Sequence, residues 1–121
     1  MQETRVYRVQ DQDGRGPWKP GFSDNWVIDR PDHANLMPFF VEFPHVSFKI
    51  ECGSGCLDLI QLKRWFTQQE YTTLLRHGYR AVQMNVDEIL AESAVQVLFR
   101  RTRPFCQAVD FVELYPDLLK G

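Results

Sequence analysis

The sequence lacks any segment suited to crossing a membrane or entering a secretory pathway. Its longest apolar runs are only a few residues, whereas a helix needs about 20 apolar residues to span a bilayer. The chain begins Met1-Gln2-Glu3, without a basic stretch followed by an apolar one, so no signal peptide is expected. We therefore predict a cytoplasmic protein that has no contact with membranes.

An excess of positive charge is also absent. The 14 lysines and arginines are outnumbered by 16 aspartates and glutamates, which gives a net charge of -2. Proteins that bind nucleic acid usually carry a basic surface that meets the phosphates. The overall balance therefore argues against nucleic acid as a direct ligand.

Cysteine is scarce, and the three residues cannot all pair within one chain. A reducing cytoplasm favours free thiols. The spacing of Cys52 and Cys56 also allows a zinc interpretation, because two nearby thiolates can hold a tetrahedral metal. Such a site would need two more ligands, drawn from Cys106, the histidines or a carboxylate. Buried free thiols in a loop are the favoured alternative, and no metal is assigned.

Familiar catalytic motifs are missing as well. The sequence contains no phosphate-binding loop, no Gly-x-Gly-x-x-Gly, no His-Glu-x-x-His and no Gly-x-Ser-x-Gly. The glycines around Arg15 are not followed by a predicted helix that could hold a phosphate at its N-terminus. Because His33, His45 and His77 lie in separate segments, no spacing pairs a histidine with a cysteine nucleophile.

What the chain does have is enough apolar material for one packed domain over residues 1–121. Hydrophobic residues make up 44% of the sequence, and 121 residues is a common domain size. Residues 17–44 hold several prolines together with isolated aromatic side chains. We expect them to form a long ordered loop that its aromatic residues pack down.

The order of apolar and polar residues predicts both strands and helices. Alternation and β-branched residues indicate strands at 5–10, 46–51, 79–86, 95–99 and 109–114. Glycines predict turns at 11–17 and 52–56. Helical spacing indicates a helix over 59–66, which Ser54 or Asp58 caps. Thr67 and Glu70 form a capping box that begins a second helix, and His77 and Gly78 end it. Residues 87–92 suggest a single helical turn.

These elements predict an α+β fold, with a largely antiparallel twisted sheet and a central helix pair. Several segments of this outline resemble mono-ADP-ribosyltransferase-like proteins, especially small phage and prophage proteins. The residues that carry the resemblance are Val6-Tyr7-Arg8, Gly14-Arg15-Gly16-Pro17-Trp18, the segment 56–66 with Leu62, Trp65 and Phe66, Gly78-Tyr79, and Gln96-Val97-Leu98-Phe99.

The resemblance implies an NAD-using enzyme that modifies a protein partner. It places Arg8 against the phosphates and ribose of NAD. A late-strand glutamate of the family corresponds here to Gln96, which carries no charge, so Glu92 or Asp87 would have to supply the carboxylate. The remaining candidate cofactor-binding residues are Tyr7, Gly16, Trp18 and Ser47. Some phage proteins with such a fold act against bacterial defence, including anti-CRISPR proteins, which implies a host defence complex as partner and the host cytoplasm as location.

The alternative hypothesis is a protein that inhibits without catalysis. It would block a larger assembly through the aromatic loop and the basic edge formed by Arg100, Arg101 and Arg103. Aromatic and arginine side chains dominate the energetics of protein interfaces. Either a monomer or a homodimer fits this composition.

Overall fold

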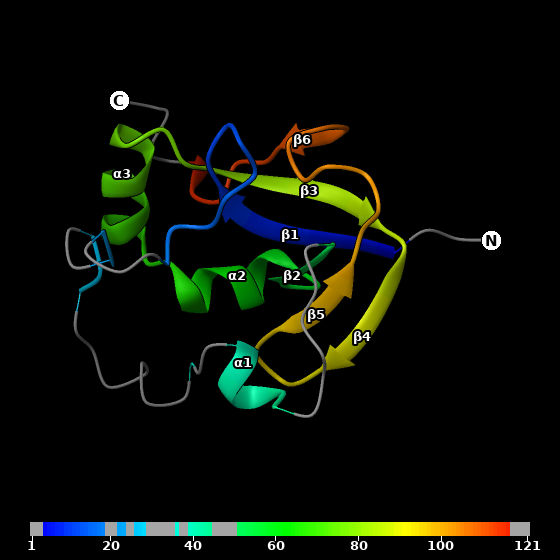
Figure 1. Cartoon of the computed structure of the whole chain (residues 1–121). Helices are drawn as coiled ribbons and strands as arrows, with labels where there is room; N and C mark the ends of the chain where they lie inside the picture. Colours follow the sequence, from blue (N-terminus) through cyan, green and yellow to red (C-terminus); the bar gives the residue numbers. More distant parts are fainter. Residues whose placement is uncertain are drawn as a thin grey trace.

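A computed structural model describes residues 4–18, 22–23, 26–28, 36, 39–44 and 51–116, and Figure 1 shows the arrangement of its elements. Strands predominate, and two helices lie together in the middle of the sequence. In chain order the elements are β1 (Thr4–Gln10), α1 (Phe39–Glu42), β2 (Cys52–Gly55), α2 (Leu59–Trp65), α3 (Gln68–Arg76), β3 (Arg80–Val86), β4 (Glu88–Glu92), β5 (Val97–Arg100) and β6 (Val109–Phe111). The predicted α+β class is confirmed.

The strands form two antiparallel sheets of three strands each. Sheet A has the order β1-β3-β6, and sheet B has the order β2-β5-β4. The two sheets meet where the backbones of Tyr7 and Cys56 exchange two hydrogen bonds of 2.8 Å. The predicted antiparallel pairing is therefore present, divided between two sheets.

Sheet A has an apolar core on each face because successive side chains of a strand point to opposite sides. One face presents Val9 and Ala81 to a cluster that includes side chains from α2 and α3. The opposite face presents Val6 and Met84 to a second cluster that contains Phe99 of sheet B. Sheet A thus packs against the helices through one face and against sheet B through the other.

The helix ends follow the predicted capping chemistry. The Asp58 side chain accepts a hydrogen bond from the Gln61 N–H and begins α2. The capping box of Thr67 and Glu70 begins α3. At the other end Gly78 has φ +86°, and the two N–H groups after His77 bond back to carbonyls of the last turn. This is a Schellman motif, in which glycine adopts the left-handed conformation at little cost.

The capping glutamate also fixes part of the loop that the sequence analysis expected to be packed by its aromatic residues. Glu70 is fully buried, and its second carboxylate oxygen accepts a 2.9 Å hydrogen bond from the N–H of Ile28. Close by in the sequence, Trp26 is buried, and its indole N–H donates to the carbonyl of Pro17. These parts of the loop are therefore ordered against the core.

The prediction of a helical turn over residues 87–92 is wrong. Glu88 to Glu92 form β4, which pairs with β5 through a register shift between Ile89 and Ala91. The Asp87 carboxylate accepts hydrogen bonds from the N–H and hydroxyl of Thr102 instead of capping a helix. Pairing with β5 outweighs the local helix-start signal, because strand preferences depend on tertiary context.

The predicted turn over residues 52–56 is also wrong. Cys52 to Gly55 form β2, which pairs with β5. The glycines are needed for close approach rather than for turning. A Cβ at position 55 would lie 3.0 Å from the carbonyl oxygen of Tyr7. Only glycine allows the two backbones to come this close.

The remaining predicted strands differ mainly at their ends. β5 begins at Val97 because the Ser93 hydroxyl accepts the N–H groups of Val95 and Gln96 and closes a turn before it. β6 ends at Phe111, well short of the predicted end at residue 114. Of the predicted strand 46–51, residues 46–50 lie outside the described residues and residue 51 lies in a turn.

Candidate functional site

Arg8 lies on β1, on the face of sheet A that points toward sheet B. Its guanidinium carbon is 5.0 Å from the centre of the Phe105 ring, and its Nη2 donates a long hydrogen bond of 3.4 Å to the carbonyl of Gly14. Among the described residues, no partner reaches its buried Nε. Burial lowers the pKa of Arg8 to about 10, and Asp11 partly opposes this effect. The Arg8 guanidinium therefore makes few polar contacts.

Glycines close the space around Arg8. A Cβ at position 53 would lie 2.6 Å from the Phe105 ring and 2.8 Å from Nη1 of Arg8. A Cβ at position 14 would lie 2.8 Å from Cβ of Phe105. Such distances are too short for real Cβ contacts, so the side chains of Arg8 and Phe105 occupy the space that the glycines leave. We define Arg8, Gly14, Gly53 and Phe105 as the closed arginine–phenylalanine pair.

Gln96 lies in the turn between β4 and β5 and is 3% exposed. Its side-chain N–H donates a 2.8 Å hydrogen bond to Oε1 of Glu42, which also accepts a 2.8 Å bond from the Ser93 hydroxyl. Glu92, the predicted source of negative charge, is exposed and pairs with Val97 at the end of β4. The carboxylate beside Gln96 is thus Glu42, which no local sequence signal indicated.

The other predicted cofactor-binding residues are spread over several places. Tyr7 makes the backbone bridge to Cys56 and packs its side chain toward the helices. Gly16 lies beside Arg8, because a Cβ there would be 3.5 Å from Nη2. Trp18 belongs to an aromatic cluster described next, and Ser47 lies outside the described residues.

Trp18 forms the exposed end of this aromatic cluster. Its ring centre lies 4.6 Å from that of Trp26 and 6.1 Å from those of Trp65 and Phe66. The other three rings are buried, whereas Trp18 is 48% exposed. The cluster is fixed to the β4–β5 turn, because the indole N–H of Trp65 donates a 2.9 Å hydrogen bond to the carbonyl of Val95.

The structure brings together only some of the predicted catalytic and cofactor-binding residues. Arg8 and Gly16 lie together, and Gln96 and Glu92 lie at the β4–β5 turn. The hydrogen bonds of Arg8 and Gln96 go to different segments, to Gly14 and Glu42 respectively. Gly53 and Phe105 pack against the Arg8 side chain, and its unpartnered Nε is buried, so a dinucleotide would have to reach Nη1 or Nη2.

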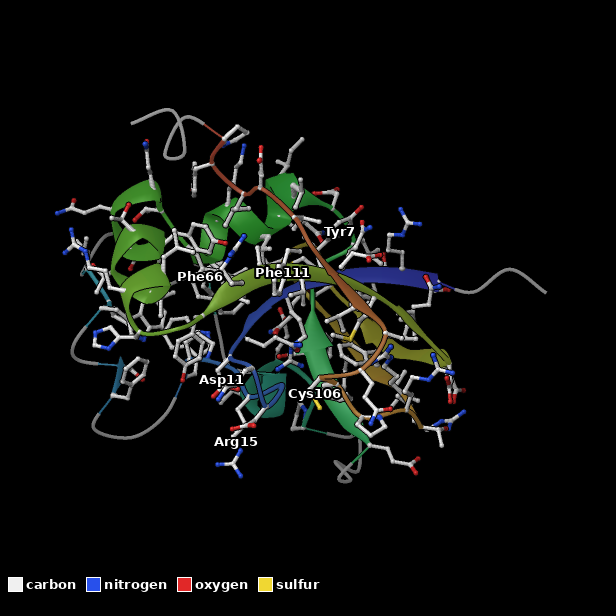
Figure 2. All side chains as sticks on the ribbon, turned by 90° about the horizontal axis from the view of Figure 1, so that it is seen from above. Tyr7, Asp11, Arg15, Phe66, Cys106 and Phe111 are labelled. Atoms are coloured by element: carbon white, nitrogen blue, oxygen red, sulfur yellow. The ribbon has the colours of Figure 1, made fainter. Side chains whose placement is uncertain are left out.

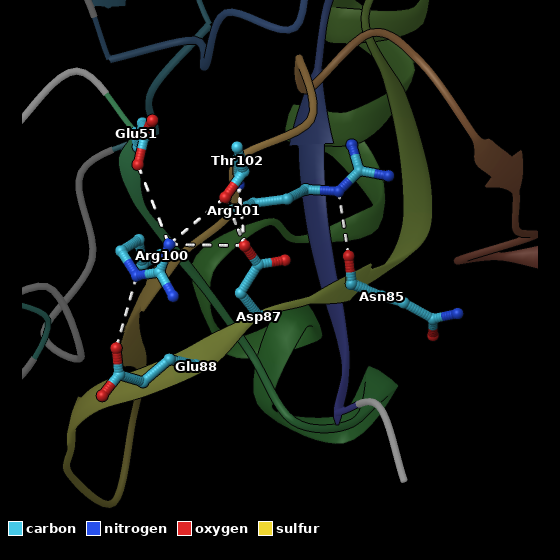
Figure 3. A network of polar contacts seen from close by, with 7 residues as sticks. All are labelled: Glu51, Asn85, Asp87, Glu88, Arg100, Arg101 and Thr102. Carbon is cyan, nitrogen blue, oxygen red and sulfur yellow. Dashed lines mark hydrogen bonds and ion pairs between the residues drawn. The ribbon is translucent and has the colours of Figure 1, made fainter. Parts of the chain in front are cut away.

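The basic edge is largely neutralised within the chain, as Figure 3 shows. Arg100 contacts the carboxylates of Asp87 and Glu88 at 3.4 and 3.3 Å, and that of Glu51 at 3.8 Å. Arg101 is buried and donates to three backbone carbonyls, those of Asn85, Pro104 and Ala108. Arg103 is exposed.

The same network has an electrostatic consequence for Asp87. The hydroxyl and N–H of Thr102 hold the pKa of Asp87 below its usual value, and Arg100 adds to this effect. The carboxylate therefore stays ionised and ties the start of β4 to the end of β5.

The thiols differ in accessibility. Cys52 and Cys56 are buried and Cys106 is exposed, all three as free thiols. Burial, reinforced by Asp58, raises the pKa of Cys56 to about 12, and its sulfur lies 3.7 Å from the Val95 carbonyl oxygen. Within the described residues no three His, Cys, Asp or Glu side chains cluster as metal ligands would.

A second arginine–phenylalanine pair lies at the far edge of sheet A. The guanidinium carbon of Arg80 is 4.6 Å from the centre of the Phe111 ring. Both residues line a shallow hollow of about 550 Å³, together with Gln10 and Cys106. Phe111 is 66% exposed, so we call this the open arginine–phenylalanine pair. Sequence analysis missed it because β6 is short and pairs across a long separation.

Comparisons with known proteins give one match. The family model described as "Bacteriophage T4 Y00F protein" matches residues 1–114 of the chain. No curated protein and no solved structure matches it. In addition, none of the helices in the described part of the chain has the length and apolar character needed to span a membrane.

Proposed function

The chain belongs to the bacteriophage T4 Y00F protein family, and we propose that it acts by binding a bacterial protein through the surface around Trp18, without catalysis. The observation that carries this proposal is the half-exposed Trp18 ring, which packs edge-on and at a tilt against a buried aromatic cluster. Such binding would block a larger host assembly, for example a defence complex in the host cytoplasm.

Trp18 is held in place before any partner binds, which lowers the entropic cost of binding. A side chain that is already held in place loses little conformational entropy when a partner covers it. Trp18 is held by Trp26, Trp65 and Phe66, while about half of its surface stays in water. Rigid tryptophans of this kind are common hot spots, because covering them removes a large apolar area from water.

The basic edge contributes less to this proposal than the sequence suggested. Arg100 is surrounded by three carboxylates and Arg101 bonds to the backbone, so both would have to give up internal contacts to meet an acidic partner. The proposed binding surface therefore centres on Trp18 and not on the predicted basic edge.

The test compares two variants that each remove one exposed apolar side chain. Tagged chain is produced in bacteria, and proteins bound in stoichiometric amounts are identified and then purified for reconstitution. We expect Trp18→Ala to weaken the reconstituted complex by about a hundredfold, the size of a typical hot spot. Ile60→Ala, on the exposed side of α2, is the control and should leave affinity unchanged.

The mass of the partner separates binding from modification. After incubation with the chain, with or without NAD, the intact mass of the partner should not change. Equal loss of affinity in both variants would show that Trp18 has no special role and would contradict the proposal.

A second candidate, an NAD-using ADP-ribosyltransferase-like activity on the same partner, is favoured by one observation. The Glu42 carboxylate lies beside Gln96 and supplies the negative charge that the amide lacks. A fixed carboxylate stabilises developing positive charge better than a neutral amide does. NAD would provide the transferred group when bound; Arg8 and Gly16 would hold its phosphates.

Thermal unfolding measured with NAD tests this candidate without knowledge of the partner. Binding to the folded state should raise the melting temperature of the wild-type chain. The shift should disappear in Arg8→Lys, which keeps the charge but loses the planar fork that binds phosphate. An unchanged melting temperature at millimolar NAD would exclude the candidate.

A further inference from the structure

The outer edge of β6 has backbone groups that face away from sheet A. In antiparallel pairing, alternate residues bond to the neighbouring strand, and the residues between them point the other way. The N–H of Val112 bonds to the carbonyl of Ala81, which places Asp110 among the residues that bond to β3. The N–H and C=O groups of Val109 and Phe111 therefore point outward.

The same rule is confirmed on the other edge of sheet A. Along β3, alternate residues bond to β6 and the residues between them bond to β1. The backbone groups of Tyr7 in β1 therefore point away from β3, and they exchange two hydrogen bonds with Cys56. That edge is thus joined to sheet B. Among the described residues, no strand pairs with the outward side of β6.

An apolar side chain stands on this open edge. Phe111 is 66% exposed, although exposed edge strands usually carry charge or are covered. The Arg80 guanidinium packs on its ring, 4.6 Å from the ring centre. Figure 2 shows Phe111 on β6 and Cys106 in the loop before it, seen from above. The edge thus offers free backbone groups and a positioned aromatic ring.

Two residues that line the adjoining hollow each have a buried polar atom without a partner among the described residues. The Gln10 side-chain N–H donates to the carbonyl of Phe105, and because a carbonyl can only accept, the orientation of this amide is fixed. Its oxygen, like Nε of Arg80, has no hydrogen-bond partner among the described residues. Gln10 is 3% exposed and lines the hollow. The hollow beside the open edge is therefore lined in part by polar side chains whose hydrogen bonds within the described residues are incomplete.

The charge of Asp110 indicates what kind of strand can add to the edge of β6. Asp110 is exposed, lies between Val109 and Phe111, and points to the opposite face of the sheet. Its carboxylate accepts a long hydrogen bond of 3.5 Å from the side-chain amide of Gln83. In an added strand, the residue opposite Asp110 would lie in the closely spaced kind of pair, with Cα atoms about 4.5 Å apart. A lysine or arginine is favourable there.

A second copy of this chain fits poorly. When two β6 strands pair so that both Val109 and Phe111 of each copy are used, Asp110 of one copy lies directly opposite Asp110 of the other. Like charges in that position are destabilising. The occupant is therefore a different chain.

We propose that the edge of β6 binds an extended segment of a protein partner, which adds to sheet A as a fourth strand. The segment has the pattern apolar–basic–apolar: the basic residue faces Asp110, and the two apolar residues lie on the same face as Phe111 and Val109. Backbone hydrogen bonds supply the affinity and these side chains supply the specificity, as in other cases of strand addition. This surface is separate from the one around Trp18 and stands independently of it.

The experiment selects peptides from a displayed library of random linear sequences, using the purified full-length chain. We expect enriched sequences that alternate apolar residues with a central lysine or arginine. A synthetic peptide of the enriched sequence should shift the amide resonances of Val109 and Phe111. Asp110→Lys should change the preference of the central position from basic to acidic residues.

Two substitutions at one position isolate the backbone contribution. Phe111→Val removes the ring and keeps the outward N–H, whereas Phe111→Pro removes both. The N–H of residue 111 does not bond to β3, so proline leaves the internal ladder intact. We expect Phe111→Pro to bind the peptide about tenfold more weakly than Phe111→Val, the effect of one lost hydrogen bond. Circular dichroism and melting temperature confirm that both variants fold.

Several results would overturn the proposal. These are the absence of any enriched peptide, equal binding by Phe111→Val and Phe111→Pro, or peptide binding that is lost in Trp18→Ala instead. Light scattering over a range of protein concentrations tests whether a second copy of this chain binds the edge of β6 instead. A dimer that forms in the wild-type chain and is lost in Phe111→Pro would show that β6 pairs with a second copy.

Discussion

Two arginine–phenylalanine pairs lie on the same face of sheet A, and they differ in what surrounds them. The closed pair, Arg8 with Phe105, has a distance of 5.0 Å from guanidinium to ring, and the open pair, Arg80 with Phe111, has 4.6 Å. In each pair the Nε atom of the arginine is buried without a hydrogen-bond partner among the described residues. Nearly the same local geometry thus occurs twice.

The difference comes from the neighbouring backbone. Gly53 of β2 lies against the closed pair so tightly that a Cβ there would overlap both side chains. Beside the open pair, Gly78 has no heavy atom within 4 Å of where its Cβ would be. An arginine on an aromatic ring is therefore part of the packing in one place and part of an accessible surface in the other. Recognising the residue pair alone does not distinguish these roles.

The largest expected difference between the two regions concerns the thiols. Cys106 is exposed and lines the hollow at the open pair, whereas Cys56 is buried, with its pKa raised to about 12. Relative to an ordinary thiol of pKa 9.0, this lowers the thiolate fraction at neutral pH about a thousandfold. With a coloured disulfide reagent at pH 7.5, Cys106 should react at once and Cys56 only after unfolding. Rapid reaction of Cys56 in the Cys106→Ser variant would contradict this.

Truncating the two phenylalanines should affect stability very differently. Phe105 packs against the core cluster that contains Phe99, so Phe105→Ala should lower the free energy of unfolding by about 3 kcal/mol. Phe111 is mostly exposed to water, so Phe111→Ala should change the free energy of unfolding by about 0.5 kcal/mol or less. Urea unfolding measures both values. Similar losses for the two variants would mean that the open pair is also part of the packing.

Adding one methyl group tests how closely the glycines fit. Gly53→Ala must displace the Phe105 ring and the Arg8 side chain, which should cost about 2 kcal/mol. Gly16→Ala is the matched control, because its Cβ would meet Arg8 at an ordinary contact distance of 3.5 Å. The melting temperature of each variant gives the comparison. A Gly53→Ala variant as stable as Gly16→Ala would show that the closed pair has room for a ligand.

Local signals in the sequence predicted the middle of the fold well. Thr67 and Glu70 form the capping box, and Gly78 ends α3, because these interactions join residues only a few positions apart. The same reasoning failed for residues 87–92, where pairing with β5 decides the conformation. The candidate site was harder to predict, since Gln96 meets Glu42 across a separation of 54 residues.

The sequence by itself determined where α2 and α3 begin and end and which side chains alternate along β1 and β3, whereas α1 lies in a segment predicted as a loop. Each of these follows from hydrogen bonds or periodicity within one short segment. Only the tertiary structure decided that Arg8 is enclosed while Phe111 remains exposed. The reason is that β2 and the loop at Phe105 converge on residue 8 from distant parts of the chain, and no segment taken alone contains that contact.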